Sequence, residues 1–95
     1  MMRPITQDDL IAATRAMMIR PRVGRITWMC CLLHDAHAAD RFRKRLRKAH
    51  PKWGDGSLIS RVFKEPRAPV ARLDACYLHA LADTVRAIGI WRDRV

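Results

Sequence analysis

Acidic residues and long apolar runs are both scarce in this sequence. Nine Asp and Glu stand against 19 Lys and Arg among 95 residues, which gives a formal net charge of +10. No stretch approaches the ~20 apolar residues that a transmembrane helix needs, and residues 1–9 lack the apolar core of a signal peptide. We therefore expect a cytoplasmic protein with no transmembrane segment. Its positive charge favours nucleic acid as a partner, followed by an acidic protein or an anionic membrane surface.

Cysteine is scarce as well, and its arrangement excludes a disulfide framework. The three cysteines are an odd number, and two of them, Cys30 and Cys31, are adjacent. Such cysteines suit a reducing compartment, where they pack as small apolar groups. A hydrophobic fraction of 49% is enough for a small core, so residues 1–95 are predicted to form a single helical domain.

The sequence also lacks the patterns on which catalytic and metal sites depend. It has no glycine-rich phosphate-binding motif and no nucleophile elbow. Cys30, His34 and His37 fall on one side of a predicted helix, and Cys76 and His79 form an i, i+3 pair on another. Four of these five side chains could hold a tetrahedral zinc ion if the helices met, although no standard ligand spacing matches. We expect packed thiols and hydrogen-bonded histidines instead, and hence no metal, no cofactor and no enzymatic activity.

The features that are present indicate helices. Apolar residues recur at helical spacing, and no strand pattern, internal repeat or low-complexity segment appears. Capping residues and prolines give the boundaries of the predicted elements. These elements are an opening helix that Thr6 caps and Pro21 ends, a long helix from Ile26 to His50, a short helix that Ser57 caps, and a last helix that Asp74 caps. The prediction is an all-α fold, a small four-helix domain around one long central helix.

The first half of the long helix carries apolar residues on two faces. Met29 lies on one face, and Trp28 and Leu32 lie on another. A helix that is apolar on both sides is normally covered by neighbours on both sides. The pattern therefore predicts that this helix is the centre of the domain. On its surface, His37 and Asp40 are expected to form an ordinary i, i+3 pair.

The second half of the long helix is a basic amphipathic segment. Six of the eight residues from Arg41 to Lys48 are Lys or Arg. Phe42 and Leu46 share a narrow apolar sector, while basic residues occupy a sector roughly 100° wide opposite them. Proline disfavours the α conformation in the residue before it, so Pro51 ends the helix at His50. We expect these positive side chains to stand together in solvent.

The segment AHAADRFRKRLRKAHPKWGDGSL, followed later by DACYLHALA, resembles a small uncharacterised family of alphaproteobacterial proteins. The likeness extends from the first predicted helix to the last, and its most distinctive part runs from Ala38 to Leu58. No activity is attached to this family, so the resemblance implies no residue roles. It does imply that Trp53, Gly54 and Gly56 form a specific turn and not a loose linker.

The basic segment leads to the main functional prediction, a small nucleic-acid-associated, DNA-binding protein. Its side chains could contact several phosphates without strong sequence specificity, and Trp53 could stack on a base. A helix-turn-helix fits less well, because the turn is too long and the charge lies on the first helix. The charge could also form only a solvated helix face. The predicted binding residues are Arg41, Arg43, Lys44, Arg45, Arg47, Lys48, Lys52 and Trp53.

An alternative prediction is a protein–protein interaction module or adaptor. The last helix carries an apolar stripe, and Trp91 is the candidate for an exposed aromatic residue. A small helical core also makes oligomerisation attractive. The stripe could complete a homodimer, or dock the protein as a subunit of a phage-like or regulatory assembly. The predicted partner interface consists of Leu78, Leu81, Val85, Ile88 and Trp91.

Overall fold

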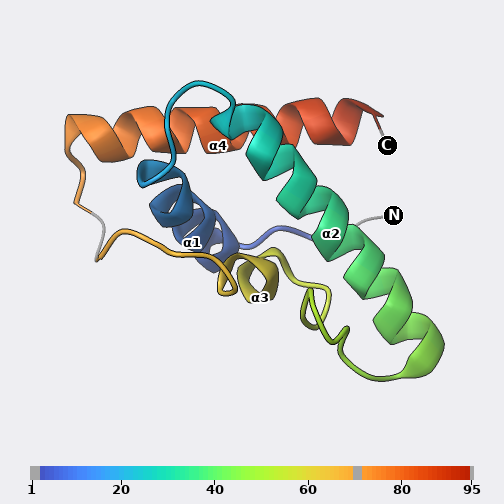
Figure 1. The fold of residues 1–95 in the computed structure, drawn as a ribbon. Helices are drawn as coiled ribbons and strands as arrows, with labels where there is room; N and C mark the ends of the chain where they lie inside the picture. Colours follow the sequence, from blue (N-terminus) through green and yellow to red (C-terminus); the bar gives the residue numbers. More distant parts are fainter. Residues whose placement is uncertain (1–2, 70–71, 95) are drawn as a thin grey trace.

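The computed structural model describes residues 3–69 and 72–94 of the chain. These residues form four α-helices and no strand, so the all-α prediction is confirmed. None of the helices in the described part of the chain combines the length and apolar character needed to span a bilayer. The helices are α1 (Gln7–Met18), α2 (Arg25–Leu46), α3 (Leu58–Val62) and α4 (Ala75–Arg94) (Figure 1).

The start of α1 is fixed by a capping box that also fixes α3. Thr6 Oγ1 accepts a hydrogen bond from the Asp9 N–H, and Asp9 Oδ2 accepts one from the Thr6 N–H at 2.8 Å. The other oxygen of Asp9, Oδ1, accepts from the Ile59 N–H in the first turn of α3 at 2.9 Å. Asp9 is only 3% exposed. One carboxylate therefore satisfies free N–H groups at the starts of two helices.

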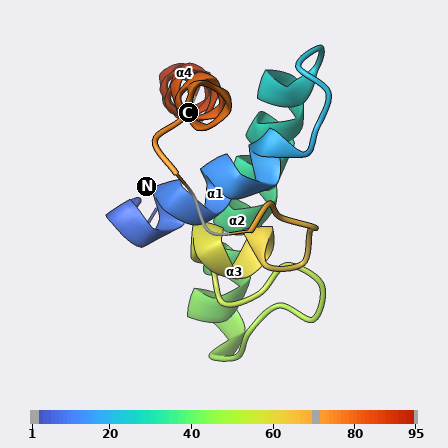
Figure 2. The ribbon, with the colours of Figure 1, turned by 90° about the vertical axis from the view of Figure 1, so that its left-hand side faces the viewer.

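The core lies among all four helices, and α1 and α2 each contact the other three. In both views α1 lies between α4 and α3 (Figures 1 and 2). Its buried residues lie on most sides of the helix, because Ala12, Ala13 and Ala16 are small enough to admit close neighbours. By contrast α2 buries one stripe, and Cys31 and His34 on its other side are exposed. Both predicted apolar faces of the long helix contribute to the core, with Met29 on one and Leu32 and the half-buried Trp28 on the other.

The long helix also ends four residues earlier than predicted, at Leu46. Arg47 follows in the left-handed conformation with φ 58°, and its N–H donates to the Arg43 carbonyl at 2.7 Å. His50 then pairs with Gly54 through two backbone hydrogen bonds, which closes a tight turn. A left-handed cap is normally glycine or asparagine, so an arginine there gives no sequence signal. Arg47 and Lys48 consequently leave the helical face on which Lys48 was predicted to lie.

The last helix buries a different stripe from the one predicted. Asp74 caps it as expected, accepting from the Tyr77 N–H at 2.9 Å, and the helix continues through Gly89 to Arg94. The residues that it buries are Tyr77, Ala80, Thr84, Ala87 and Trp91. The alanines of this stripe allow α4 to approach the alanine-rich α1 closely, so Leu78 and Val85 remain exposed while Leu81 and Ile88 are half-buried. Trp91, predicted to be exposed, is only 6% exposed and lies against His37 with ring centroids 5.5 Å apart.

Candidate nucleic-acid interface

The predicted phosphate-binding residues gather at the end of α2 and in the turn that follows. This part of the chain extends away from α4 (Figure 1). All seven predicted Lys and Arg side chains are exposed, and Trp53 beside them is half-buried. We call this set the basic cluster; it consists of Arg41, Arg43, Lys44, Arg45, Arg47, Lys48 and Lys52.

Little of the charge of the basic cluster is neutralised within the protein. Lys44 Nζ lies 3.0 Å from Asp40 Oδ2, yet the Lys44 side chain is 66% exposed. Within residues 3–69 and 72–94, no other member of the cluster has a carboxylate partner within 4.0 Å. Positive charge is therefore available to an external anion.

Three acidic residues elsewhere pair with cations outside the cluster. Asp83 on α4 accepts from the buried Arg25 at the start of α2, with Nε 2.6 Å from Oδ2. Arg61 on α3 joins Asp35 and Glu65, each at 3.0 Å. The Arg25–Asp83 and Arg61–Asp35 pairs join helices, whereas Arg61–Glu65 is a local i, i+4 pair. None of these three carboxylates pairs with the basic cluster.

The turn that carries Trp53 is held tightly against α2. Gly56 has φ +103°, and a Cβ at this position would lie 2.6 Å from the Cα of Asp40. Only glycine permits both the conformation and the close approach. The specific turn implied by the family resemblance is therefore confirmed.

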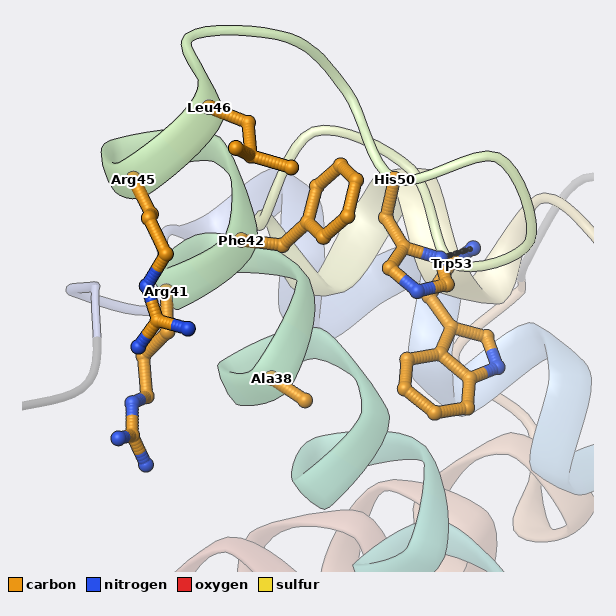
Figure 3. Close-up of a pocket in the computed structure, with 7 residues that line it drawn as sticks. All are labelled: Ala38, Arg41, Phe42, Arg45, Leu46, His50 and Trp53. Carbon is orange, nitrogen blue, oxygen red and sulfur yellow. Dashed lines mark hydrogen bonds between the residues drawn. The ribbon is translucent and has the colours of Figure 1, made fainter.

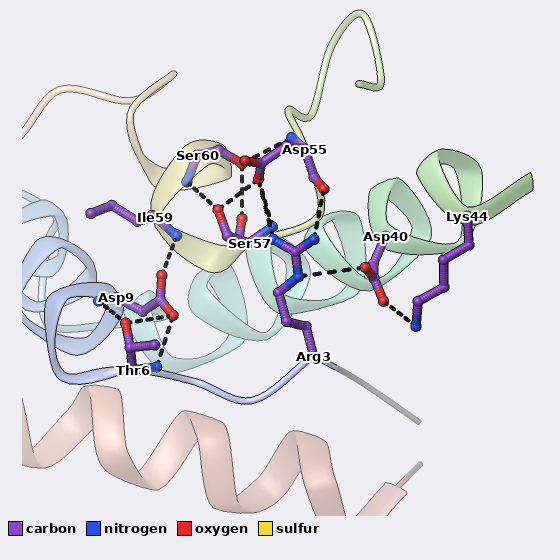
Figure 4. A network of polar contacts seen from close by, with 9 residues as sticks. All are labelled: Arg3, Thr6, Asp9, Asp40, Lys44, Asp55, Ser57, Ile59 and Ser60. Carbon is purple, nitrogen blue, oxygen red and sulfur yellow. Dashed lines mark hydrogen bonds and ion pairs between the residues drawn. The ribbon is translucent and has the colours of Figure 1, made fainter. Parts of the chain in front are cut away.

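Asp40 lies beneath this turn as a buried carboxylate and does not form the predicted surface pair with His37. It is 1% exposed, and Arg3 Nε lies 3.6 Å from its Oδ1 (Figure 4). Arg3 also reaches Asp55, whose Oδ1 lies 3.7 Å from Nη1. Backbone and side-chain hydrogen bonds from Ser57 lower the pKa of Asp55 to about 2, and Arg3 adds to this effect. Two carboxylates thus anchor the residues before α1 to the turn.

A groove runs between α2 and this turn. Its volume is about 420 Å³. His50 and Trp53 stack with ring centroids 4.6 Å apart and an interplanar angle of 7°, and Phe42 meets His50 edge to face at 4.8 Å. Figure 3 shows Ala38 and the Trp53 indole on opposite sides of an open space. The residues that line the groove are Ala38, Arg41, Phe42, Arg45, Leu46, His50 and Trp53.

The sequence predicts that Trp53 stacks on a base, but it does not reveal the groove. The other aromatic side chains of the groove are Phe42 and His50. From the sequence, Phe42 belongs only to the apolar strip of the helix and His50 only to its end. The available signal was the spacing from Ala38 through Phe42 to Leu46, which places three side chains in one row on α2. The opposite wall depends on the turn that returns His50 and Trp53 to α2, which the helical period does not reveal.

The predicted partner interface is divided by the fold. Leu78 and Val85 are 49% and 52% exposed, whereas Leu81 and Ile88 are half-buried. Trp91 belongs to the core. A second hollow of about 490 Å³ lies beside Val85 and Ile88. Part of the predicted stripe is therefore accessible, but its aromatic member is not.

The cysteines and histidines do not assemble. The Cys30 Sγ donates to the Ala87 carbonyl at 3.6 Å, and burial raises the pKa of this thiol. Cys76 and His79 are exposed in the first turns of α4, upstream of the residues through which α4 meets α2. In the described part of the chain, no group of three or more His, Cys, Asp and Glu side chains could hold a metal ion.

Comparison with known proteins gives a family but no named relative. No curated protein and no solved structure matches the chain. The model of a domain of unknown function, DUF7742, matches residues 3–88, which include all of α1, α2 and α3, most of α4 and the whole basic cluster. The predicted resemblance to an uncharacterised family is thereby supported. The chain belongs to the DUF7742 family.

Proposed function

We propose that this protein is a small basic nucleic-acid-associated protein that binds the phosphate backbone without strong sequence specificity. The observation that supports the proposal is the basic cluster, whose side chains are exposed and, apart from Lys44, lack a carboxylate partner in the described part of the chain. A regulatory or accessory role in the cytoplasm forms part of this proposal.

Backbone contact is favoured over reading of base sequence because no suitable recognition helix follows α2. A helix-turn-helix places its second helix in the major groove. Here α3 has only five residues and buries Leu58 and Val62 against the core. Phosphate contacts position a protein on nucleic acid but carry no sequence information. Binding should therefore be strongly salt-dependent, with log K falling by about 0.9 per decade of salt for each duplex phosphate neutralised.

Titration of labelled duplex DNA at two salt concentrations tests the proposal. The double variant Arg43→Glu with Lys48→Glu reverses two exposed charges of the basic cluster that lie outside the groove. We expect it to lower affinity at least about tenfold and to flatten the salt dependence. The matched control is Arg22→Glu with Arg86→Glu, which makes the same change in net charge at exposed positions on other elements. Equal losses in both variants, or no binding at low salt, would contradict the proposal.

A second candidate function is supported by the exposure of Leu78 and Val85 on α4. Two aliphatic side chains one heptad apart on an exposed helix face are typical of helix–helix docking. Under this alternative the protein is an interaction module, as a homodimer or as a subunit of a phage-like or regulatory assembly. Light scattering that finds a stable dimer, together with no affinity for DNA at low salt, would favour it over nucleic-acid binding.

A further inference from the structure

The groove beside Trp53 is open yet rigidly built. His50 Nδ1 accepts hydrogen bonds from the N–H groups of Lys52 and Trp53, at 3.0 and 3.1 Å. The His50 backbone pairs with Gly54 in both directions. The stacked rings of His50 and Trp53 are therefore held by the turn itself. A preformed site loses less conformational entropy when a ligand binds.

The second feature of the groove is positive charge on its α2 side. Arg41 and Arg45 are one helical turn apart, both exposed, and both contribute to the α2 edge of the groove. Figure 3 shows their guanidinium groups on the side of α2 away from Trp53, so they lie beside the aromatic space and not within it. Neither has a carboxylate within 4.0 Å in the described part of the chain. A purely apolar ligand would gain nothing from two guanidinium groups, and a simple anion would gain nothing from the aromatic rings. A nucleotide carries both a flat aromatic base and an anionic phosphate.

We propose that this groove binds an unpaired base of a single-stranded nucleic acid, with Arg41 and Arg45 on the adjoining phosphates. The inference rests on the proposed function and specifies the form of nucleic acid. The base packs against Trp53 and the row formed by Ala38 and Phe42. The volume of the groove, about 420 Å³, falls within the ~300–1,000 Å³ of typical small-molecule sites.

Placing a base of a duplex in this groove requires more free energy than placing a base of a single strand there. Bases in a duplex are already paired and stacked, and moving one out of the stack is unfavourable by a few kcal/mol. In a single strand the base is free to stack on an aromatic side chain. Charge alone would favour the duplex, so a preference for single strands isolates the contribution of the groove.

The experiment compares oligonucleotides that differ only in their bases. Fluorescence anisotropy measures binding of labelled twelve-residue oligothymidylate, oligouridylate and an abasic strand with the same number of phosphates. We expect both base-bearing strands to bind about tenfold or more tightly than the abasic strand, since stacking stabilises binding by ~1–3 kcal/mol per base. The tighter of the two strands distinguishes DNA from RNA as the source of the base.

Substitutions of Trp53 locate the effect. We expect Trp53→Ala to bind base-bearing and abasic strands about equally, with its affinity for the abasic strand unchanged. Trp53→Phe keeps an aromatic ring, so it should retain most of the preference and guards against a folding defect in the first variant. Binding of oligothymidylate should also quench tryptophan fluorescence in the natural protein but not in Trp53→Phe, because Trp28 and Trp91 lie outside the groove.

The outcomes separate this inference from the function on which it rests. Equal affinity of the natural protein for base-bearing and abasic strands would overturn the base site and leave phosphate binding intact. An undiminished preference in Trp53→Ala would overturn it as well. Failure to bind any strand at low salt would overturn both proposals.

Discussion

At the scale of single residues, the contact between Gly56 and Asp40 determines where the aromatic turn sits. Gly56 lies directly on the α2 backbone, and the Asp40 carboxylate beneath it is held by Arg3 and Lys44. A side chain at position 56 would push the turn away from α2. The groove would then lose the wall that His50 and Trp53 provide.

Replacing Gly56 with alanine should therefore destabilise the protein by about 2–4 kcal/mol. The expected loss combines the strain of a positive φ with overpacking against Asp40.

Two matched substitutions separate these effects in urea denaturation. Gly24→Ala has the strain (φ +81°) but open space around it, so it should lose about 1–2 kcal/mol. Gly89→Ala lies in a helix with open space and should gain about 0.5–1 kcal/mol. If Gly56→Ala cost no more than Gly24→Ala, the packing on Asp40 would be refuted.

Local residue roles were predictable, and long-range ones were not. Thr6, Ser57 and Asp74 cap helices as the sequence predicts, because a cap depends only on residues two or three positions away. The burial of Asp40 depends on Gly56 sixteen positions later and on Arg3 far upstream. Asp40 is an acidic residue beside a basic segment, which indicates an internal role. The spacing of residues in the sequence does not identify the partners of Asp40.

At the scale of elements, the C-terminal end of α2 is unusual because arginine occupies the left-handed position. Arg47 has φ 58°, where an L-residue with a Cβ is strained by roughly 1–2 kcal/mol. The conformation turns the chain toward His50 and brings Trp53 back to α2. The early helix end therefore forms the groove.

This geometry predicts opposite effects for one substitution at two neighbouring sites. Arg47→Gly relieves the left-handed strain and should stabilise the protein by about 0.5–1 kcal/mol. Arg45→Gly places glycine inside α2 and should destabilise it by about 1 kcal/mol. Both variants remove one positive charge, so the difference between them in thermal unfolding reports backbone conformation alone. A loss of stability in both variants would mean that Arg47 is not left-handed in solution.

The number of helices followed from periodicity, whereas their packing did not. The most apolar stripe of α4 consists of Leu78, Leu81, Val85 and Ile88. The neighbouring alanine stripe nevertheless supplies the fully buried residues, and Ile88 packs against the core only partly buried. The choice depends on how closely α1 and α4 approach, and small residues on both helices permit an approach that leucines would prevent. Hydropathy ranks faces by apolar character and contains no information about that distance.

At the scale of the whole molecule, the seven basic residues of the cluster lie together at one end of a small body. The molecule measures 42 × 27 × 21 Å, and the basic cluster occupies the end of α2 that extends away from α4. Asp35, Glu65 and Asp83 are held in ion pairs with Arg25 and Arg61, which lie outside the cluster. At 0.01 M salt the Debye length of about 30 Å spans most of the molecule, while at 0.15 M it falls to about 8 Å. Repulsion within the cluster is therefore strong only at low salt.

Salt should consequently have opposite effects on stability and on binding. Raising NaCl from 0.01 to 0.15 M screens self-repulsion and should raise the melting temperature by about 4 °C, equivalent to roughly 1 kcal/mol in a domain of this size. The same change should weaken nucleic-acid binding. In Arg43→Glu with Lys48→Glu the melting temperature should respond less to salt, because both repulsive charges are replaced by attractive ones. The Arg22→Glu with Arg86→Glu control should keep most of the response, since neither position belongs to the cluster. A melting temperature that falls with salt, or an equal response in both variants, would show that the cluster is neutralised within the protein and offers no free charge to a polyanion.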